Sequence, residues 1–119
     1  MLTWNTLSGT NIVEVVYNGD IQPNEIDGLR AALTAAVAAS GSAKLLVEVG
    51  KNGGMPPKSL IDELSGEQLI SQLGRSAVLI DKTILRMMVT AGAKMAPMEV
   101  KVYKTAERDE ALTWLTSGD

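Results

Sequence analysis

Two carboxylates lie where the sequence predicts that strands end, and their type and position suit them to chemistry. Glu48 belongs to the apolar run Leu45–Val49, and Asp81 directly follows a second run, Ala77–Ile80. Parallel sheets bind ligands beyond the carboxyl ends of their strands, so the two form a candidate polar cluster. Partial burial would raise the pKa of Glu48 and suit it to acid–base work or to anchoring a ligand. The alternatives for Glu48 are an ion pair with Arg75 or a lysine, or a solvated position.

Two missing residue types narrow the chemistry open to these carboxylates. The chain has neither histidine nor cysteine, which removes the commonest general base near neutral pH, thiolate nucleophiles and sulfur-ligated metals. No spacing of acidic residues indicates a metal site, since Asp62 and Glu63 are neighbours on a predicted helix and face different directions. An enzyme would have to combine Glu48 or Asp81 with a lysine. We therefore expect no cofactor, no metal and no catalysis.

A glycine-rich loop, Gly50–Ser59, follows the run that contains Glu48 and leads into a predicted helix. Lys51, Lys58 and Ser59 in this loop predict a weak anion site at the helix start. A nucleotide-binding P-loop is disfavoured, because that motif has glycine directly before lysine and successive backbone amides facing the phosphates. Here prolines stand at positions 56 and 57 and supply no amide hydrogens. The simpler interpretation is a connector with an ordinary helix cap.

Two apolar stripes in the middle of the chain predict a binding surface. The stretch 84–98 contains four of the six methionines, and methionine clusters line adaptable surfaces. A second wide apolar face is predicted on the helix that begins near Ser59. The candidate groove residues are Leu60, Ile61, Leu64, Ile84, Met87, Met88 and Met95. Ordinary core packing and an interface between copies of the chain are the alternatives.

The elements that must position these residues follow an alternating pattern. Short β-like runs separated by helix-like stretches predict the order ββαβαβαβα, which is typical of a mostly parallel sheet. The glycine-containing turn between Leu2–Leu7 and Ile12–Tyr17 predicts an antiparallel hairpin with the first strand at one edge. Pro23 and Gly41 bound the first helix. The remaining elements after Leu45–Val49 are predicted over Ser59–Leu73, Arg75–Asp81, Thr83–Ala96, Met98–Lys104 and Glu107–Thr116.

Composition bounds the class of protein. With 119 residues, of which 45% are apolar and 21% charged, the chain fits one globular α/β domain, 1–119. A formal net charge of −3 argues against a nucleic-acid partner, since neutralising phosphates requires a basic surface. No signal peptide is visible at the N-terminus, and no window of about 18 apolar residues predicts a transmembrane segment. The sequence therefore predicts a cytoplasmic protein.

Three stretches, taken together, resemble a known family. They are Lys44–Val49, Gly74–Asp81, and Val100–Tyr103 leading to Glu110–Leu115. In order and separation they resemble the SpoIIAA-like proteins, which are related in fold to the STAS domains of anti-sigma-factor antagonists and more distantly to CRAL-TRIO lipid-binding domains. The resemblance covers roughly Ile12 to Leu115. It implies a single STAS/SpoIIAA-like domain: a five-stranded, mostly parallel sheet with an N-terminal antiparallel strand and four helices packed mainly on one side.

The resemblance also implies a regulatory protein-binding module, or a binder of an apolar small molecule under the two middle helices. Two departures limit what it implies. Gly53–Pro56 and Lys82–Leu85 stand where family members often carry aromatic residues, and the chain has no phenylalanine. The phosphorylatable Asp-Ser-Ser/Thr-Gly pattern of the antagonists is missing, and the nearest hydroxyl is Ser59. A phosphorylation switch is therefore not expected.

These observations rank the functions. We predict a non-catalytic binding or regulatory module that acts through contacts with an unidentified protein partner. The first alternative is a carrier or sensor of an apolar, lipid-like small molecule, and the second is a small enzyme that uses a carboxylate and a lysine at the strand ends. A homo-oligomer is left open, with Trp4 on the predicted edge strand either sealing the sheet or supporting dimerisation.

Overall fold

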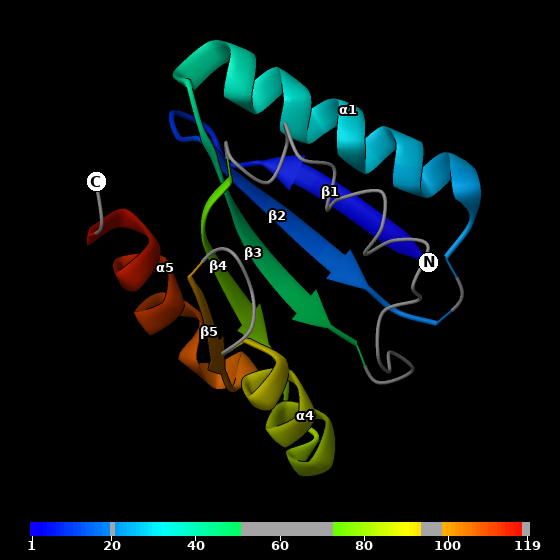
Figure 1. Cartoon of the computed structure of the whole chain (residues 1–119), viewed down its shortest axis with the longest axis vertical. Helices are drawn as coiled ribbons and strands as arrows, with labels where there is room; N and C mark the ends of the chain where they lie inside the picture. Colours follow the sequence, from blue (N-terminus) through cyan, green and yellow to red (C-terminus); the bar gives the residue numbers. More distant parts are fainter. Residues whose placement is uncertain (20, 51–72, 94–98, 118–119) are drawn as a thin grey trace.

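Five strands form one mixed sheet in the order β1-β2-β3-β4-β5 (Figure 1). The computed structural model describes residues 1–19, 21–50, 73–93 and 99–117. The strands are β1 (Leu2–Thr6), β2 (Ile12–Tyr17), β3 (Ala43–Val49), β4 (Leu73–Leu79) and β5 (Val100–Tyr103). Strand β1 pairs antiparallel with β2, and every later neighbour is parallel. The predicted hairpin and parallel sheet are therefore confirmed.

Three α-helices lie among the described residues. They are α1 (Pro23–Ser40), α4 (Thr83–Ala93) and α5 (Arg108–Ser117), the last preceded by a 3-10 turn, η1 (Thr105–Glu107). Helix α1 ends as predicted, because Gly41 adopts φ 83° and its N–H donates to the Val37 carbonyl at 2.7 Å. The helix predicted from Ser59 lies outside the described residues, apart from its last residue. That residue, Leu73, begins β4 instead.

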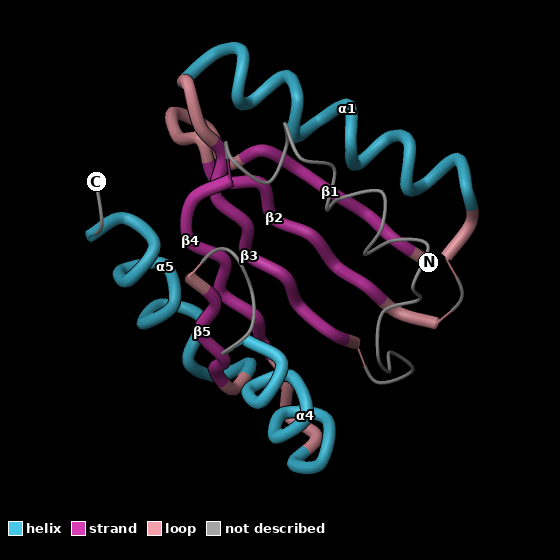
Figure 2. The backbone as a smooth tube through the Cα atoms, viewed as in Figure 1, coloured by secondary structure: helices cyan, strands magenta, loops and turns pink. Residues whose placement is uncertain are grey.

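Helices α1 and α5 cover opposite faces of the sheet. Side chains alternate along a strand, so Val13 and Val15 of β2 pack with α1, whereas Ile12 packs in a second cluster with Leu46 and with α5. Figure 2 shows the strands lying between α1 and α5. The expectation that the helices pack mainly on one side is therefore corrected for this pair. The physical reason is that the strands carry apolar residues at both alternations, as buried parallel strands do, and both faces need a cover.

The first face is closed by tight contact between β1 and α1. The indole ring of Trp4 lies directly against the backbone of Gly28, where a side chain would overlap it. The Glu25 carboxylate accepts hydrogen bonds from the Leu2 N–H and the Gln22 N–H, each at 2.9 Å. These bonds hold the pKa of Glu25 below its usual range, and the bond from the Leu2 N–H has the largest effect. The edge strand is therefore tied to the first turn of α1.

Cations from the sheet hold α5 on the second face. The Lys44 ammonium donates to the Leu115 carbonyl at 2.6 Å, and the Arg75 guanidinium donates to the Trp114 carbonyl at 2.8 Å. Arg75 also stacks over the Trp114 ring at 4.8 Å. The last carbonyls of a helix lack intrahelical partners and carry partial negative charge, so cations at this end satisfy and stabilise them. Polar anchoring and apolar packing therefore act together on α5.

We predict that Gly28→Ala destabilises the protein by about 1–3 kcal/mol, because the added methyl group would overlap the Trp4 ring. Urea denaturation followed by circular dichroism measures the change. The same substitution in a Trp4→Leu background is the control, since the smaller side chain leaves space for the methyl. An equal loss in both backgrounds would contradict the proposed contact.

Lys44→Met keeps most of the apolar stem but removes the ammonium donor, so the buried Leu115 carbonyl loses this partner. We expect a loss of about 1–3 kcal/mol in the free energy of unfolding and faster amide hydrogen exchange in α5. Lys104→Met, at an exposed lysine, is the matched control. If the two variants behave alike, Lys44 does not anchor the helix.

Candidate functional site

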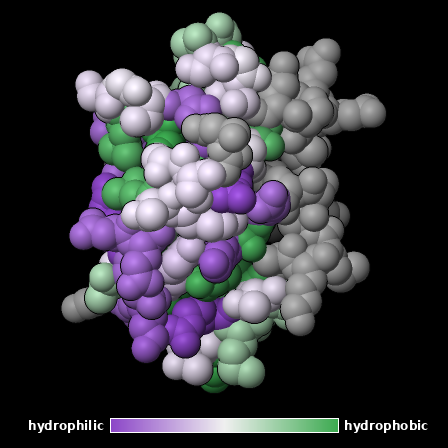
Figure 3. All heavy atoms as spheres, turned by 90° about the vertical axis from the view of Figure 1, so that its left-hand side faces the viewer, coloured by the Kyte–Doolittle hydropathy of each residue, from purple (hydrophilic) through white to green (hydrophobic). Residues whose placement is uncertain are grey.

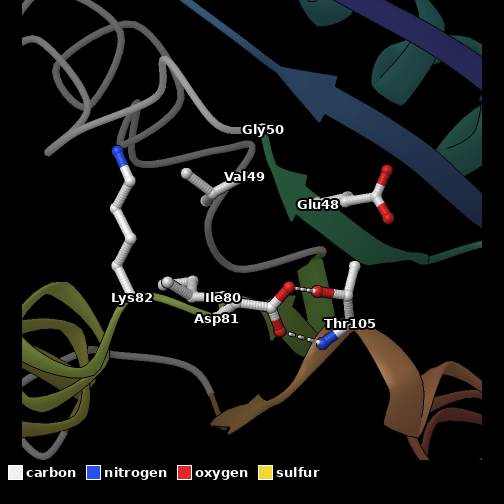
Figure 4. A pocket seen from close by; sticks show the side chains of 7 residues that line it. All are labelled: Glu48, Val49, Gly50, Ile80, Asp81, Lys82 and Thr105. Carbon is white, nitrogen blue, oxygen red and sulfur yellow. Dashed lines mark hydrogen bonds between the residues drawn. The ribbon is translucent and has the colours of Figure 1, made fainter.

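The carboxyl ends of β3 and β4 border an open hollow of about 200 Å³ (Figure 4). Its lining comes from the ends of both strands and from the start of η1, and consists of Glu48, Val49, Gly50, Ile80, Asp81, Lys82 and Thr105. Strands β3 and β4 are parallel neighbours, with Glu48 opposite Leu79, so their ends meet at one edge of the sheet. The structure thus brings the two predicted strand-end carboxylates to the same hollow. It is smaller than most ligand pockets, which measure about 300–1,000 Å³.

Asp81 is engaged by the turn that follows β5. Its carboxylate accepts a hydrogen bond from the Thr105 N–H at 2.9 Å and another from the Thr105 hydroxyl. Both bonds hold the pKa of Asp81 below its usual range, and the bond from the Thr105 hydroxyl has the larger effect. A carboxylate kept ionised in this way is poorly suited to act as a general acid near neutral pH. The bonds instead connect the end of β4 to η1.

Glu48 is half-buried in the middle of the sheet, opposite Val16 of β2. In Figure 4 its carboxylate points away from the Lys82 ammonium, so these two charges are not brought together. Arg75, the other partner considered for Glu48, forms an ion pair with Glu99 at 3.3 Å. The geometry therefore gives no support to a catalytic pair formed by Glu48 and Lys82.

A second candidate surface lies on α4. Ile84, Met87, Met88 and Ala91 recur at the spacing of one helix face, and we call these four residues the α4 outer face. The side chains of Ile84, Met87 and Met88 are 76%, 67% and 50% exposed, whereas Leu85 on the inner side is buried. Figure 3 views the side of the molecule that bears α5 and shows hydrophobic atoms at its lower end, where Figure 1 places α4. Helix α4 is therefore apolar on both its inner and its outer side.

Several predicted site residues lie outside the described residues. They are the anion-site candidates Lys51, Lys58 and Ser59, and the groove candidates Leu60, Ile61, Leu64 and Met95. Of the predicted groove, the structure describes Ile84, Met87 and Met88, which share the α4 outer face. The anion site and the two-helix groove stay predictions.

Two residues of these surfaces were not found from the sequence. Ala91 lies seven positions after Ile84, and residues at this spacing share one face of a helix. The helical period could therefore have predicted that Ala91 belongs to the same apolar face. Thr105 carried no comparable signal, because its contact with Asp81 joins residues 24 positions apart. That contact depends on β4 and β5 being neighbours in the sheet.

The opposite end of the sheet holds another hollow, of about 370 Å³. Its lining consists of Gly9, Thr10, Asn11, Ile12, Ser40, Lys44 and Thr116. Lys44 already donates to the Leu115 carbonyl, which gives the ammonium a structural role here. Within the described ranges, no group of three His, Cys, Asp or Glu side chains could hold a metal ion.

The contact between Asp81 and Thr105 predicts a pH dependence of stability. The folded pKa lies below the unfolded value of about 3.9, so at acid pH the unfolded chain binds more protons. The contribution of Asp81 is therefore complete above about pH 5 and is lost as the pH falls through the folded pKa. Asp81→Asn should flatten the stability profile between about pH 3 and pH 5, measured by urea denaturation. Asp27→Asn, at an exposed aspartate, is the control, and an unchanged profile in Asp81→Asn would contradict the assignment.

Comparisons with known proteins place the chain in a family. A family model described as SpoIIAA-like matches residues 12–116 of the 119, and it supports a regulatory or binding module as the general class of function. Neither the curated proteins nor the solved structures include a match to this chain. None of the helices that the structure describes is long and apolar enough to cross a membrane. The match spans both faces of the sheet, from β2 to α5, and the chain belongs to the SpoIIAA-like family.

Proposed function

We propose that the protein is a non-catalytic binding module that acts through contact between the α4 outer face and a protein partner. The observation that carries the proposal is the exposure of Ile84, Met87 and Met88, each of which is at least half exposed. Membership in the SpoIIAA-like family supports a binding or regulatory module in general. The proposal adds the surface and the kind of partner.

The physical argument concerns the two apolar sides of α4. A helix that is apolar on one side packs that side on its own core, as Leu85 does here. The second apolar side is exposed to water. A partner that covered it would gain about 25 cal/mol of binding free energy for each Å² of apolar surface buried. Methionine side chains are unbranched and flexible, so Met87 and Met88 can adapt to the shape of a partner. A protein that presents an apolar groove or helix face fits this surface.

The same exposure favours a protein partner over a small apolar ligand. A carrier would place Ile84, Met87 and Met88 around a cavity, because pockets enclose most of the surface of their ligands. These side chains instead face outward. The described hollow nearest to α4 is lined in part by the charged residues Glu48, Asp81 and Lys82. The hydrogen bonds that keep Asp81 ionised disfavour this carboxylate as a general acid.

Met87→Glu tests the proposal by placing a charge in the centre of the α4 outer face. Thr90→Glu is the matched control, because Thr90 is exposed on the same helix but outside the apolar face. We expect the native protein and Thr90→Glu to capture the same partner. Isothermal calorimetry with the purified partner should then give an affinity at least tenfold weaker for Met87→Glu than for the native protein. A tenfold loss corresponds to about 1.4 kcal/mol.

Two results would contradict this function. One is a partner that binds both glutamate variants equally well, which would place the interface elsewhere. The other is a small-molecule adduct in native mass spectrometry that disappears on denaturation and is absent from Met87→Glu. That adduct would support a carrier instead.

A further inference from the structure

The α4 outer face presents two neighbouring thioether groups to solvent. The side chains of Met87 and Met88 are each at least half exposed, whereas Leu85 on the inner side of the same helix is buried. Oxidants convert the sulfur of methionine to a sulfoxide, and a sulfur exposed to solvent is the one they reach. Both sulfur atoms are therefore accessible to an oxidant while the protein stays folded.

No thiol in the chain competes with these thioethers for an oxidant. The sequence contains no cysteine, so its six methionines hold all of its sulfur atoms. The methionines among the described residues are Met1, Met87 and Met88, and the last two lie on the surface proposed for binding. Sulfur oxidation and partner binding would therefore act on the same face of α4.

The packing of the fold does not depend on Met87 or Met88. The two apolar clusters that the described residues form around α1 and α5 include neither side chain. A sulfoxide oxygen at either position would meet water, because both side chains face outward. Oxidation disrupts a protein core when the methionine is buried in it. Here it would change the surface and leave the sheet intact.

We propose that a peroxide oxidises Met87 and Met88 to methionine sulfoxide and thereby weakens partner binding, a regulation that rests on the function proposed for the α4 outer face. With hydrogen peroxide, a sulfur lone pair attacks one peroxide oxygen, so an S–O bond forms and the O–O bond breaks. The sulfur loses two electrons. The hydroxyl proton on the transferred oxygen passes to the departing hydroxide, which leaves as water.

Reduction of the sulfoxide returns the face to its apolar state. A thiol-dependent methionine sulfoxide reductase removes the oxygen as water, and a dithiol supplies the two electrons and becomes a disulfide. Each sulfoxide exists as two epimers, which separate reductases recognise. Such enzymes need access to the side chain, and the exposure of Met87 and Met88 provides it. The modification is therefore reversible.

The polarity of the sulfoxide is the physical reason for weaker binding. The native face gains affinity by burying the apolar surface of Ile84, Met87 and Met88. A sulfoxide oxygen accepts hydrogen bonds from water, and burying it against an apolar partner costs free energy when those bonds are not replaced. We expect the doubly oxidised protein to bind its partner at least tenfold more weakly.

The double variant Met87→Leu, Met88→Leu is the matched control, because leucine keeps the face apolar and forms no sulfoxide. After hydrogen peroxide treatment, site-resolved mass spectrometry should show both sulfurs oxidised at rates within about fivefold of those in the urea-unfolded chain. On a phenyl matrix, treatment should shift the native protein to earlier elution by more than it shifts the double variant. Slow oxidation of both sulfurs in the folded chain, or equal elution shifts, would overturn the proposal.

Isothermal calorimetry with the partner captured by the native protein tests the effect on binding. Peroxide treatment should weaken binding to the native protein at least tenfold and leave the double variant unchanged. Sulfoxide reductases for both epimers, with dithiothreitol as the dithiol, should restore the native affinity. If Met87→Glu weakens binding and oxidation of both sulfurs does not, this regulation is overturned and the proposed function stands. If neither change affects binding, both are overturned.

Discussion

The structure depends on covering both faces of a mostly parallel sheet. Parallel strands bury both alternations of their side chains, so each face must have its own helix. Helix α1 covers the face of β1 to β3, where its backbone at Gly28 meets the Trp4 ring. Helix α5 covers the other face with few large apolar residues, and Lys44 and Arg75 hold its last carbonyls. The second face is therefore stabilised by charge as well as by apolar contact.

The same topology decides where polar groups meet. Parallel strands end at a common edge, which is why Glu48 and Asp81 line one hollow although they are far apart in the chain. The addition of β5 beside β4 then brings Thr105 onto Asp81 and commits that carboxylate to a structural contact. Among the described residues, the exposed large apolar side chains outside the N-terminal Met1 lie at the periphery, on the α4 outer face.

Local patterns were enough to predict much of the fold. The hairpin followed from the turn between β1 and β2, and α1 from Pro23 and Gly41, because each signal acts within a few residues of the structure it specifies. Apolar periodicity predicted a helix from Thr83, and Thr83 begins α4. Periodicity could not predict which side of α4 is buried, because it does not say which of two apolar sides faces the core. Likewise, the boundary at Leu73 was misplaced because an apolar residue suits the end of a helix and the start of a strand equally well.

The sequence by itself determined the class of protein: a mostly parallel sheet with an antiparallel edge strand, and a family. It also lacks histidine and cysteine, which restricts the chemistry open to the chain. The tertiary structure decided how the side chains are used. It placed α5 on the second face and paired Arg75 with Glu99 rather than Glu48. It also gave Asp81 to Thr105 and left Met87 exposed. The physical reason is that strand order and helix placement join residues that are distant in the chain, whereas sequence patterns report only the interactions of near neighbours.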